Sequence, residues 1–133
     1  MIQGETTIRV RYGETDQMGV VYYGNYPLYY EVARTELLRA VGFSYKDLED
    51  SGIIMPVIKL ECNYIASAYY DEVLTIRTTV YQAPSVKIDF NYEIFNEKKE
   101  LINTGNTTLV FLNKNTRKPT RAPLVLVKTI DNN

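Results

Sequence analysis

The chain has 133 residues, 45% of them hydrophobic, and its 15 basic residues nearly balance its 16 acidic ones, giving a formal net charge of −1. This composition excludes a disordered chain and argues against a general nucleic-acid binder, which would carry a basic face. With no histidine and one cysteine, the sequence excludes Ser-His and Cys-His triads, His-ligated zinc and an intrachain disulfide.

The first predicted element is a strand at residues 6–12, where Ile8, Val10 and Tyr12 alternate with polar residues. A glycine-containing loop follows, and a helix is predicted over residues 26–41, with Pro27 in its first turn and Gly42 after its end. Its apolar stripe consists of Tyr26, Tyr29, Tyr30, Ala33, Leu37, Leu38 and Val41. The residues expected to lie mostly away from the stripe are Glu31, Arg34, Thr35 and Arg39. A short second helix is predicted at residues 44–52.

The rest of the chain has the alternation of β-strands. Strands are predicted at residues 57–65, 73–81, 86–95 and 101–112, with a hairpin turn at residues 96–99 and a last strand after Pro119. One strand, one long helix and a meander of strands indicate an α+β fold with an antiparallel sheet packed on one principal helix. Such a sheet leaves an edge and apolar surface uncovered, so we expect at least a homodimer, with a homotetramer also open.

The size fits a single domain spanning residues 1–133. The segment from Met1 to Glu5 has neither a basic leader nor an apolar run, and no stretch approaches the roughly 18 apolar residues of a membrane span. We therefore expect a cytoplasmic protein without a membrane span. Any catalysis has to use carboxylates, hydroxyls, lysine or backbone amides.

The segment from Tyr12 to Tyr26 has the composition of a catalytic loop. Two acidic residues, Glu14 and Asp16, precede an apolar stretch and the start of the long helix. The first amides of a helix have no intrahelical acceptors and lie at the positive end of its dipole, so they can stabilise negative charge on an oxygen. A carboxylate at the same place can attack a thioester carbonyl or take a proton from water. This order of residues therefore predicts thioester chemistry without histidine.

A family resemblance supports this interpretation. The run Asp16-Gln17-Met18-Gly19-Val20-Val21-Tyr22-Tyr23-Gly24-Asn25-Tyr26, with Glu31 and Arg34 following in the helix, resembles the signature of the 4-hydroxybenzoyl-CoA thioesterase-like hotdog proteins. That group includes the bacterial acyl-CoA thioesterases associated with the Tol–Pal system. The resemblance implies a hotdog fold, in which an antiparallel sheet of roughly five or six strands wraps a central helix. It also implies hydrolysis of acyl-CoA or acyl-carrier-protein thioesters with no metal and no redox cofactor, coenzyme A being part of the substrate.

The resemblance also assigns roles by position. Asp16 is implied to be the nucleophile or general base, and the backbone N–H of Tyr23 is implied to polarise the thioester carbonyl. The active site is expected at a dimer interface, with the nucleotide end of CoA along the surface near basic residues. The residues implied to contact the substrate in the loop and helix are Gly19, Val21, Tyr22 and Glu31. The candidates for contacts with the nucleotide are Lys59, Arg77, Lys87 and the loop from Gln82 to Ser85.

Several of these residues also have purely structural interpretations. Asp16 can be a turn residue whose carboxylate accepts a hydrogen bond from the amide two residues on. Glu14 can be a solvated charge, and Lys59 can simply face water. Glu31 and Arg34 are three residues apart in the helix and can form a surface ion pair.

The tyrosines and the cysteine have structural interpretations too, and the function has an alternative. Tyr22 and Tyr23 can serve as packing residues, and Cys62 can be a small buried hydrophobic side chain. A non-catalytic module that binds acyl-CoA or acyl-carrier protein fits the same features. A hotdog dehydratase fits less well, because those enzymes generally use a histidine and this chain has none.

Overall fold

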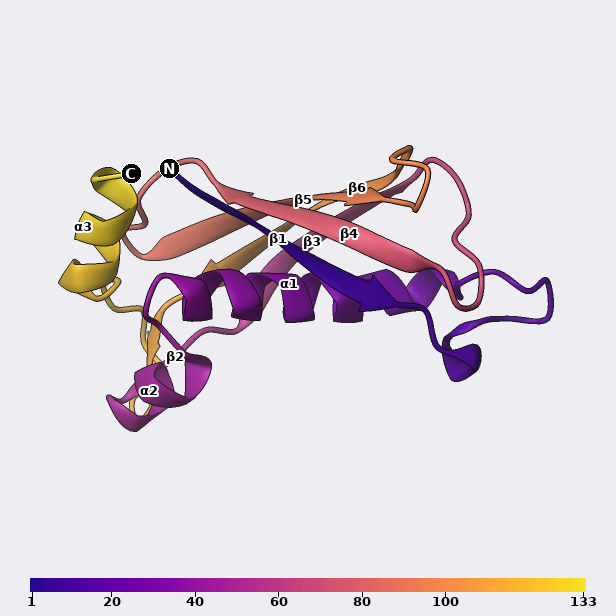
Figure 1. Cartoon of the computed structure of the whole chain (residues 1–133). Coiled ribbons are helices and arrows are strands. Elements are labelled where there is room, and N and C mark those ends of the chain that lie inside the picture. The colour runs from indigo at the N-terminus through magenta and orange to yellow at the C-terminus, as the bar shows by residue number, and fades with distance from the viewer.

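The computed structural model describes residues 1–133 and shows a curved antiparallel sheet folded around one long helix (Figure 1). The strands of the sheet, in hydrogen-bonded order, are β1 (Ile2–Arg9), β4 (Val73–Val80), β5 (Lys87–Phe95), β6 (Leu101–Val110) and β3 (Val57–Tyr64). The helices are α1 (Tyr26–Ala40), α2 (Tyr45–Asp50) and α3 (Leu124–Asp131), and the short strands β2 (Ile53–Ile54) and β7 (Leu112–Asn113) form a separate pair. The predicted α+β architecture of one helix against one antiparallel sheet is confirmed.

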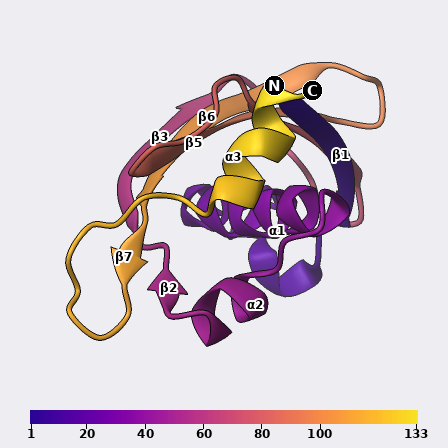
Figure 2. The same ribbon diagram turned by 90° about the vertical axis from the view of Figure 1, so that its left-hand side faces the viewer.

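The sheet wraps α1 as the alternating patterns require. In the view along the helix, β1 lies on one side of α1 and β3 on the other (Figure 2). Ile88, Phe90, Tyr92 and Ile94 of β5 point toward the helix and are at most 1% exposed. The ring of Tyr92 stacks on Tyr30 of α1, with 4.2 Å between the ring centroids. Burial of these side chains supplies most of the driving force that holds helix and sheet together.

One glycine is needed for this packing. Gly105 of β6 faces Tyr30, and a Cβ atom built at Gly105 would overlap the tyrosine ring. The absence of a side chain at this position lets α1 lie close to the sheet. Around this contact, the Tyr30 hydroxyl donates to Asn103 Oδ1 and lies 3.4 Å from the thiol of Cys62, which is half-buried.

Two predictions about the strands were wrong. The first strand begins at Ile2, and Tyr12 lies beyond its end in a 3₁₀ turn, where its side chain is 77% exposed. The segment after Pro119 forms the helix α3 instead of a strand. Leu126 and Ile130 are four residues apart and fully buried, while Lys128 between them is exposed, which fits helical spacing and not a strand, where all three would share one face. The other predicted elements are confirmed, with ends that differ by one or two residues.

The edge strand β3 differs from the rest of the sheet. Leu60 and Tyr64 are on the face that looks toward the helix layer, and Ile58 lies at an irregularity between Val57 and Lys59, yet the three are about half exposed, Ile58 at 51%, Leu60 at 45% and Tyr64 at 53%. β1, at the opposite edge, has charged residues on its outer face, and α1 packs against its inner face. β3 is therefore the edge with uncovered apolar side chains. None of the helices has the length and apolar character needed to cross a membrane.

Candidate active site

Asp16 sits in a tight loop between β1 and α1. Its backbone N–H donates to the carbonyl of Val20 at 2.9 Å, and the N–H of Gly19 donates to the Asp16 carbonyl at 3.0 Å. Gly19 has a φ of +81°, which a glycine adopts without strain. The carboxylate oxygen Oδ1 accepts the N–H of Met18 at 2.8 Å, the hydrogen bond expected of an aspartate in a turn. The other oxygen, Oδ2, accepts no hydrogen bond within the chain and is available to a substrate or a water molecule.

Glu14 anchors the start of this loop. Its carboxylate accepts hydrogen bonds from the backbone N–H of Arg11 at 2.8 Å and from the hydroxyl of Tyr29 at 3.0 Å. Burial opposes ionisation, but the hydrogen bonds and charge of Arg11 and the bond from Tyr29 outweigh it and lower the pKa of Glu14. Its backbone carbonyl accepts the N–H of Tyr22 and the side-chain amide of Asn25, both at 2.9 Å. The interpretation of Glu14 as a solvated charge was therefore wrong, because α1 and the loop need its oxygens as acceptors.

A cavity of about 300 Å³ lies between this loop, the start of α1 and the end of β3. Asp16 and Tyr23 both line it, so the structure brings the two predicted catalytic residues to one space. The lining residues are Asp16, Met18, Val20, Val21, Tyr23, Tyr26, Tyr64, Ile65, Ala66 and Ser67. Most are apolar, and this suits a site that receives the carbonyl end of an acyl group.

Tyr23 begins the 3₁₀ turn Tyr23–Asn25, which runs directly into α1. The N–H of Tyr23 donates no hydrogen bond within the chain, whereas the N–H of Asn25 bonds to the Tyr22 carbonyl at 2.9 Å. A free amide at the start of a helix is a donor for an oxygen that gains negative charge. The phenol ring of Tyr23 is 64% exposed and packs on the ring of Tyr22, 4.6 Å away between centroids.

Of the other substrate-contact candidates in the loop and helix, only Val21 lies at the cavity wall. Val21 is buried at the cavity wall and its N–H bonds to the carbonyl of Ala68, which joins the loop to the segment after β3. Gly19 and Tyr22 lie in the same loop but not on the cavity wall, and Glu31 is exposed on α1. Contacts of these residues with a substrate stay predictions.

Arg34 was expected on the outer side of α1 and is instead buried, with 7% exposure. Its Nε donates to the Tyr45 hydroxyl at 3.0 Å, and it makes no ion pair with Glu31. The predicted surface ion pair was therefore wrong. The reason is that α2 folds back along the end of α1 and places Tyr45 over the guanidinium group.

The basic candidates lie on other parts of the surface. Ser85 and Lys87 line one hollow of about 410 Å³ together with Gln82, at the β4–β5 end of the sheet. Lys59 points outward from β3 and pairs with Glu61 at 3.1 Å. Arg77 lies on the outer face of β4 between Glu5 and Glu93, at 3.4 and 3.7 Å. The chain thus gathers Ser85 and Lys87 in one place, but it brings neither Lys59 nor Arg77 to them.

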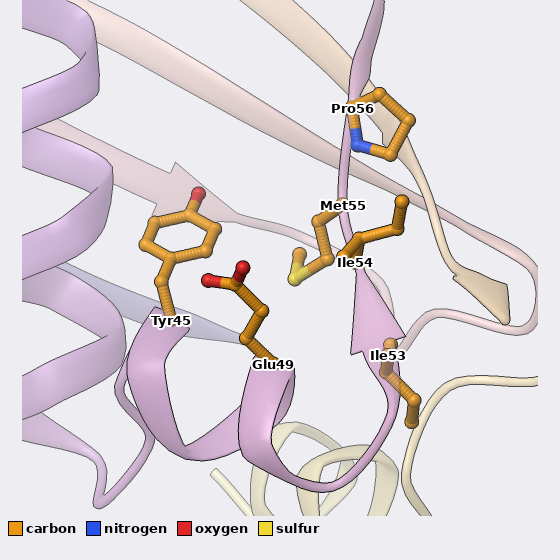
Figure 3. Close-up of a pocket in the computed structure, with 6 residues that line it drawn as sticks. All are labelled: Tyr45, Glu49, Ile53, Ile54, Met55 and Pro56. Carbon is orange, nitrogen blue, oxygen red and sulfur yellow. The ribbon is translucent and has the colours of Figure 1, made fainter. Parts of the chain in front are cut away.

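A second cavity of about 270 Å³ lies at the opposite end of α1 from Asp16, between α2 and the chain that leads into β3 (Figure 3). It is lined by Tyr45, Glu49, Ile53, Ile54, Met55 and Pro56. Figure 3 shows the Glu49 carboxylate and the Met55 side chain turned toward the same space as the Tyr45 ring. No group of three or more His, Cys, Asp or Glu side chains is placed to hold a metal ion.

The sequence analysis missed the contribution of the segment that ends β3. Tyr64, Ile65, Ala66 and Ser67 form one wall of the Asp16 cavity. The signal was present in the alternation of β3, which puts Leu60, Cys62 and Tyr64 on the helix side. The alternation could not predict that the end of β3 contacts the loop before α1, because forty residues separate the two segments in the chain and only the tertiary fold joins them.

Comparison with known proteins decides the family. Residues 10–130 match the model of the thioesterase-like superfamily. The chain belongs to that superfamily. Its thioester-hydrolase assignment and hotdog fold, predicted from the sequence, are therefore confirmed. The DHNA-CoA thioesterase of Staphylococcus aureus has a similar structure, with 46% identity, a TM-score of 0.87, and coverage of 91% of this chain and 81% of that one.

Two further proteins agree with this assignment. The acyl-CoA thioester hydrolase YbgC of Escherichia coli O6:H1 is 33% identical over 120 residues, 90% of each chain. The structure of a mutant 4-hydroxybenzoyl-CoA thioesterase in complex with 4-hydroxybenzoyl-CoA has a TM-score of 0.87 over 98% of this chain and 99% of that one. Since it is only 17% identical, that likeness concerns the fold.

Proposed function

We propose that the chain hydrolyses acyl-CoA thioesters with Asp16 as its catalytic carboxylate and the Tyr23 amide as its oxyanion donor. The observation that carries the proposal is that Asp16 and Tyr23 line one apolar cavity, and that the Oδ2 of Asp16 and the N–H of Tyr23 have no partner within the chain. The relatives named as acyl-CoA thioester hydrolase and DHNA-CoA thioesterase support the substrate class.

The arrangement suggests how water is used. Asp16 Oδ2 takes a proton from a water molecule, and the resulting hydroxide attacks the thioester carbonyl. The oxygen of the tetrahedral intermediate carries the negative charge and accepts the Tyr23 N–H. The C–S bond then breaks, the thiolate of CoA takes up the proton, and the acid leaves. The Met18 N–H on Oδ1 holds the carboxylate in a fixed orientation throughout. Direct attack by Asp16 would give the same products through an anhydride, which water then cleaves.

A homodimer is part of the proposal, because β3 exposes backbone and apolar side chains along its length. An antiparallel, two-fold pairing of β3 with β3 of a second copy would continue the sheet and cover Ile58 and Leu60. Val57 lies level with Leu109 of β6 and Ile88 of β5, at the opposite end of the strand from Tyr64.

This pairing would also complete the substrate site. A two-fold axis exchanges the ends of β3, so the second copy places the start of its β5 near the Asp16 cavity of the first. Ser85 and Lys87 lie at that end of β5 and share a polar hollow. Lys87 of the second copy is then the basic residue best placed for the nucleotide of CoA. In such a dimer, the predicted contacts with the nucleotide would come from the copy opposite the catalytic Asp16.

Release of free thiol from a panel of acyl-CoAs tests the function. The panel contains short and long aliphatic thioesters, 4-hydroxybenzoyl-CoA and 1,4-dihydroxy-2-naphthoyl-CoA, because aromatic and aliphatic acyl groups both fit a thioesterase. We expect turnover of at least one of them by the wild type. Binding without turnover across the panel would instead favour the non-catalytic module. A parallel panel of acyl-carrier-protein thioesters shows whether the acyl group is taken from CoA or from the carrier protein.

Asp16→Asn keeps the shape of the side chain and removes its charge. We expect it to lower kcat/KM by about a hundredfold or more, as expected for the loss of a positioned base. The matched control is Asp50→Asn, at an exposed position on α2 whose carboxylate pairs only with Lys46. Unchanged kcat/KM in Asp16→Asn, or an equal loss in the control, contradicts the assignment of Asp16.

A further inference from the structure

Tyr64 connects the edge strand to the proposed oxyanion donor. It is the last residue of β3, and its hydroxyl donates a hydrogen bond to the backbone carbonyl of Tyr23 at 3.0 Å. Its ring meets those of Tyr23 and Tyr26 edge-on, with centroid distances of 6.5 and 5.5 Å. Tyr64 also lines the Asp16 cavity. One side chain therefore contacts the Tyr23 residue through both its backbone and its ring.

This hydrogen bond constrains the conformation of Tyr23. The carbonyl group that accepts it belongs to the peptide that follows the Tyr23 Cα, and the free N–H belongs to the peptide that precedes it. The preceding peptide is held as well, because its carbonyl, that of Tyr22, accepts the N–H of Asn25 at 2.9 Å. With both flanking peptides held, the direction of the Tyr23 N–H is set relative to the cavity. Oxyanion donors have to be placed within about half an ångström to be effective.

We propose that Tyr64 is a positioning residue for the thioesterase reaction, and that its hydroxyl holds the Tyr23 peptide so that the N–H points at the carbonyl oxygen of the substrate. The inference rests on the proposed function, since it assumes that the Tyr23 amide is the oxyanion donor. It adds a residue that the loop signature does not contain, and it links the donor to the strand through which the two copies are proposed to pair.

The environment of Tyr64 suits this task. The neighbouring thiol of Cys62, followed by partial burial, raises the pKa of Tyr64 to about 12, so the phenol keeps its proton and can donate near neutral pH. The side chain is 53% exposed, so water can partly replace the hydrogen bond when the hydroxyl is removed. The expected effect is therefore moderate, smaller than the loss of Asp16.

Tyr64→Phe tests the proposal, because it removes the hydroxyl and keeps both ring contacts. We expect kcat to fall by about threefold to tenfold, as for the loss of one hydrogen bond, with KM changed by less than about twofold. The pH dependence of kcat/KM should keep its inflection, since the base is untouched. Thermal unfolding and oligomeric state should match the wild type. A purely structural role would instead change Tm or KM and leave kcat unaltered.

The matched control is Tyr70→Phe. Tyr70 is also about half exposed, at 55%, its ring meets Tyr12 edge-on, and its hydroxyl makes no hydrogen bond within the chain. Unchanged kcat in Tyr64→Phe, or an equal loss in Tyr70→Phe, overturns the inference while the proposed function stands. Full activity in Asp16→Asn, or no thiol release by the wild type, overturns the proposed function and this inference with it.

Discussion

β5 and β3 have almost the same pattern but opposite environments. Apolar and polar residues alternate from Ile58 to Tyr64 in β3 and from Lys87 to Ile94 in β5. The helix-facing residues of β5 are at most 1% exposed, whereas Ile58, Leu60 and Tyr64 of β3 are about half exposed. β5 lies between two strands and over α1, and β3 is the last strand on its side. Alternation therefore predicts which face of a strand is apolar, but not whether anything covers that face.

The two strands consequently do different things. β5 holds the helix to the sheet, and its interior is complete within one copy of the chain. β3 contributes Tyr64 to the proposed catalytic site and leaves Ile58 and Leu60 uncovered within one copy, where we propose that a second copy pairs. Substitutions in the interior of the sheet should therefore affect the stability of one copy, and substitutions at its edge should affect association and the site.

The largest loss of stability is expected in the middle of β5. Phe90 is fully buried, and Phe90→Ala should lower the free energy of unfolding by about 3–5 kcal/mol through lost burial and the remaining cavity. Denaturant unfolding at several protein concentrations measures it. The loss should be independent of concentration because one copy buries the side chain. In Ile58→Ala, by contrast, any loss should grow with protein concentration, because a second copy is proposed to cover Ile58. A concentration-dependent loss in Phe90→Ala would contradict this distinction.

A smaller loss is expected where the helix comes closest to the sheet. Gly105→Ala inserts a methyl group where the Tyr30 ring lies, so helix and strand have to separate. We expect the free energy of unfolding to fall by about 1–3 kcal/mol, which is typical of an overpacked interior. The same denaturant titration measures this change. Gly13→Ala is the control, because a Cβ there meets nothing within 4 Å. Equal stabilities of the two variants would show that α1 can shift without cost.

The elements with periodic burial were predictable from the sequence, and the C-terminal segment was not. The interior strands and α1 were predictable to within one or two residues, because periodic burial fixed both their type and their extent. The C-terminal segment was not, because Leu124 to Val127 is a run of apolar residues that fits either a strand or a helix. In the folded chain, Leu126 and Ile130 are buried and Lys128 between them is exposed, which fits a helix and not a strand.

The site was predictable where it depended on local sequence. The family signature located Asp16 and Tyr23, and the structure places both at one cavity. Glu14 and Arg34 were misjudged because their partners, Tyr29 and Tyr45, are recruited by folding and not marked by spacing. Tyr64 was missed for the same reason, since it reaches the loop only through the tertiary structure.

At the edge, Leu60→Lys should weaken association of the two copies. A charge in the middle of β3 has to be desolvated when a second β3 covers it, so we expect the dimer Kd to rise by about tenfold or more. The unfolding of the dissociated chain should change by no more than about 0.5 kcal/mol, because the position is half exposed there. Sedimentation velocity over a concentration series measures the first effect. Leu124→Lys, on the exposed side of α3, is the control, and an unchanged Kd in Leu60→Lys would exclude pairing through β3.

The smallest effect is expected on the outer face of the same strand. Lys59 is exposed and pairs with Glu61, so Lys59→Ala should change the free energy of unfolding by less than about 1 kcal/mol, as is usual for surface ion pairs. If Lys59 contacts the nucleotide as the sequence predicts, KM should rise about twofold to threefold at low salt and less at high salt, because salt screens exposed charges. Lys87→Ala should show the larger increase, since Lys87 shares its hollow with Ser85 and has no ion pair. Steady-state kinetics at two ionic strengths compares them. A KM that is unaltered by Lys59→Ala at low salt assigns the outer face of β3 to solvent and leaves the nucleotide to the β4–β5 loop.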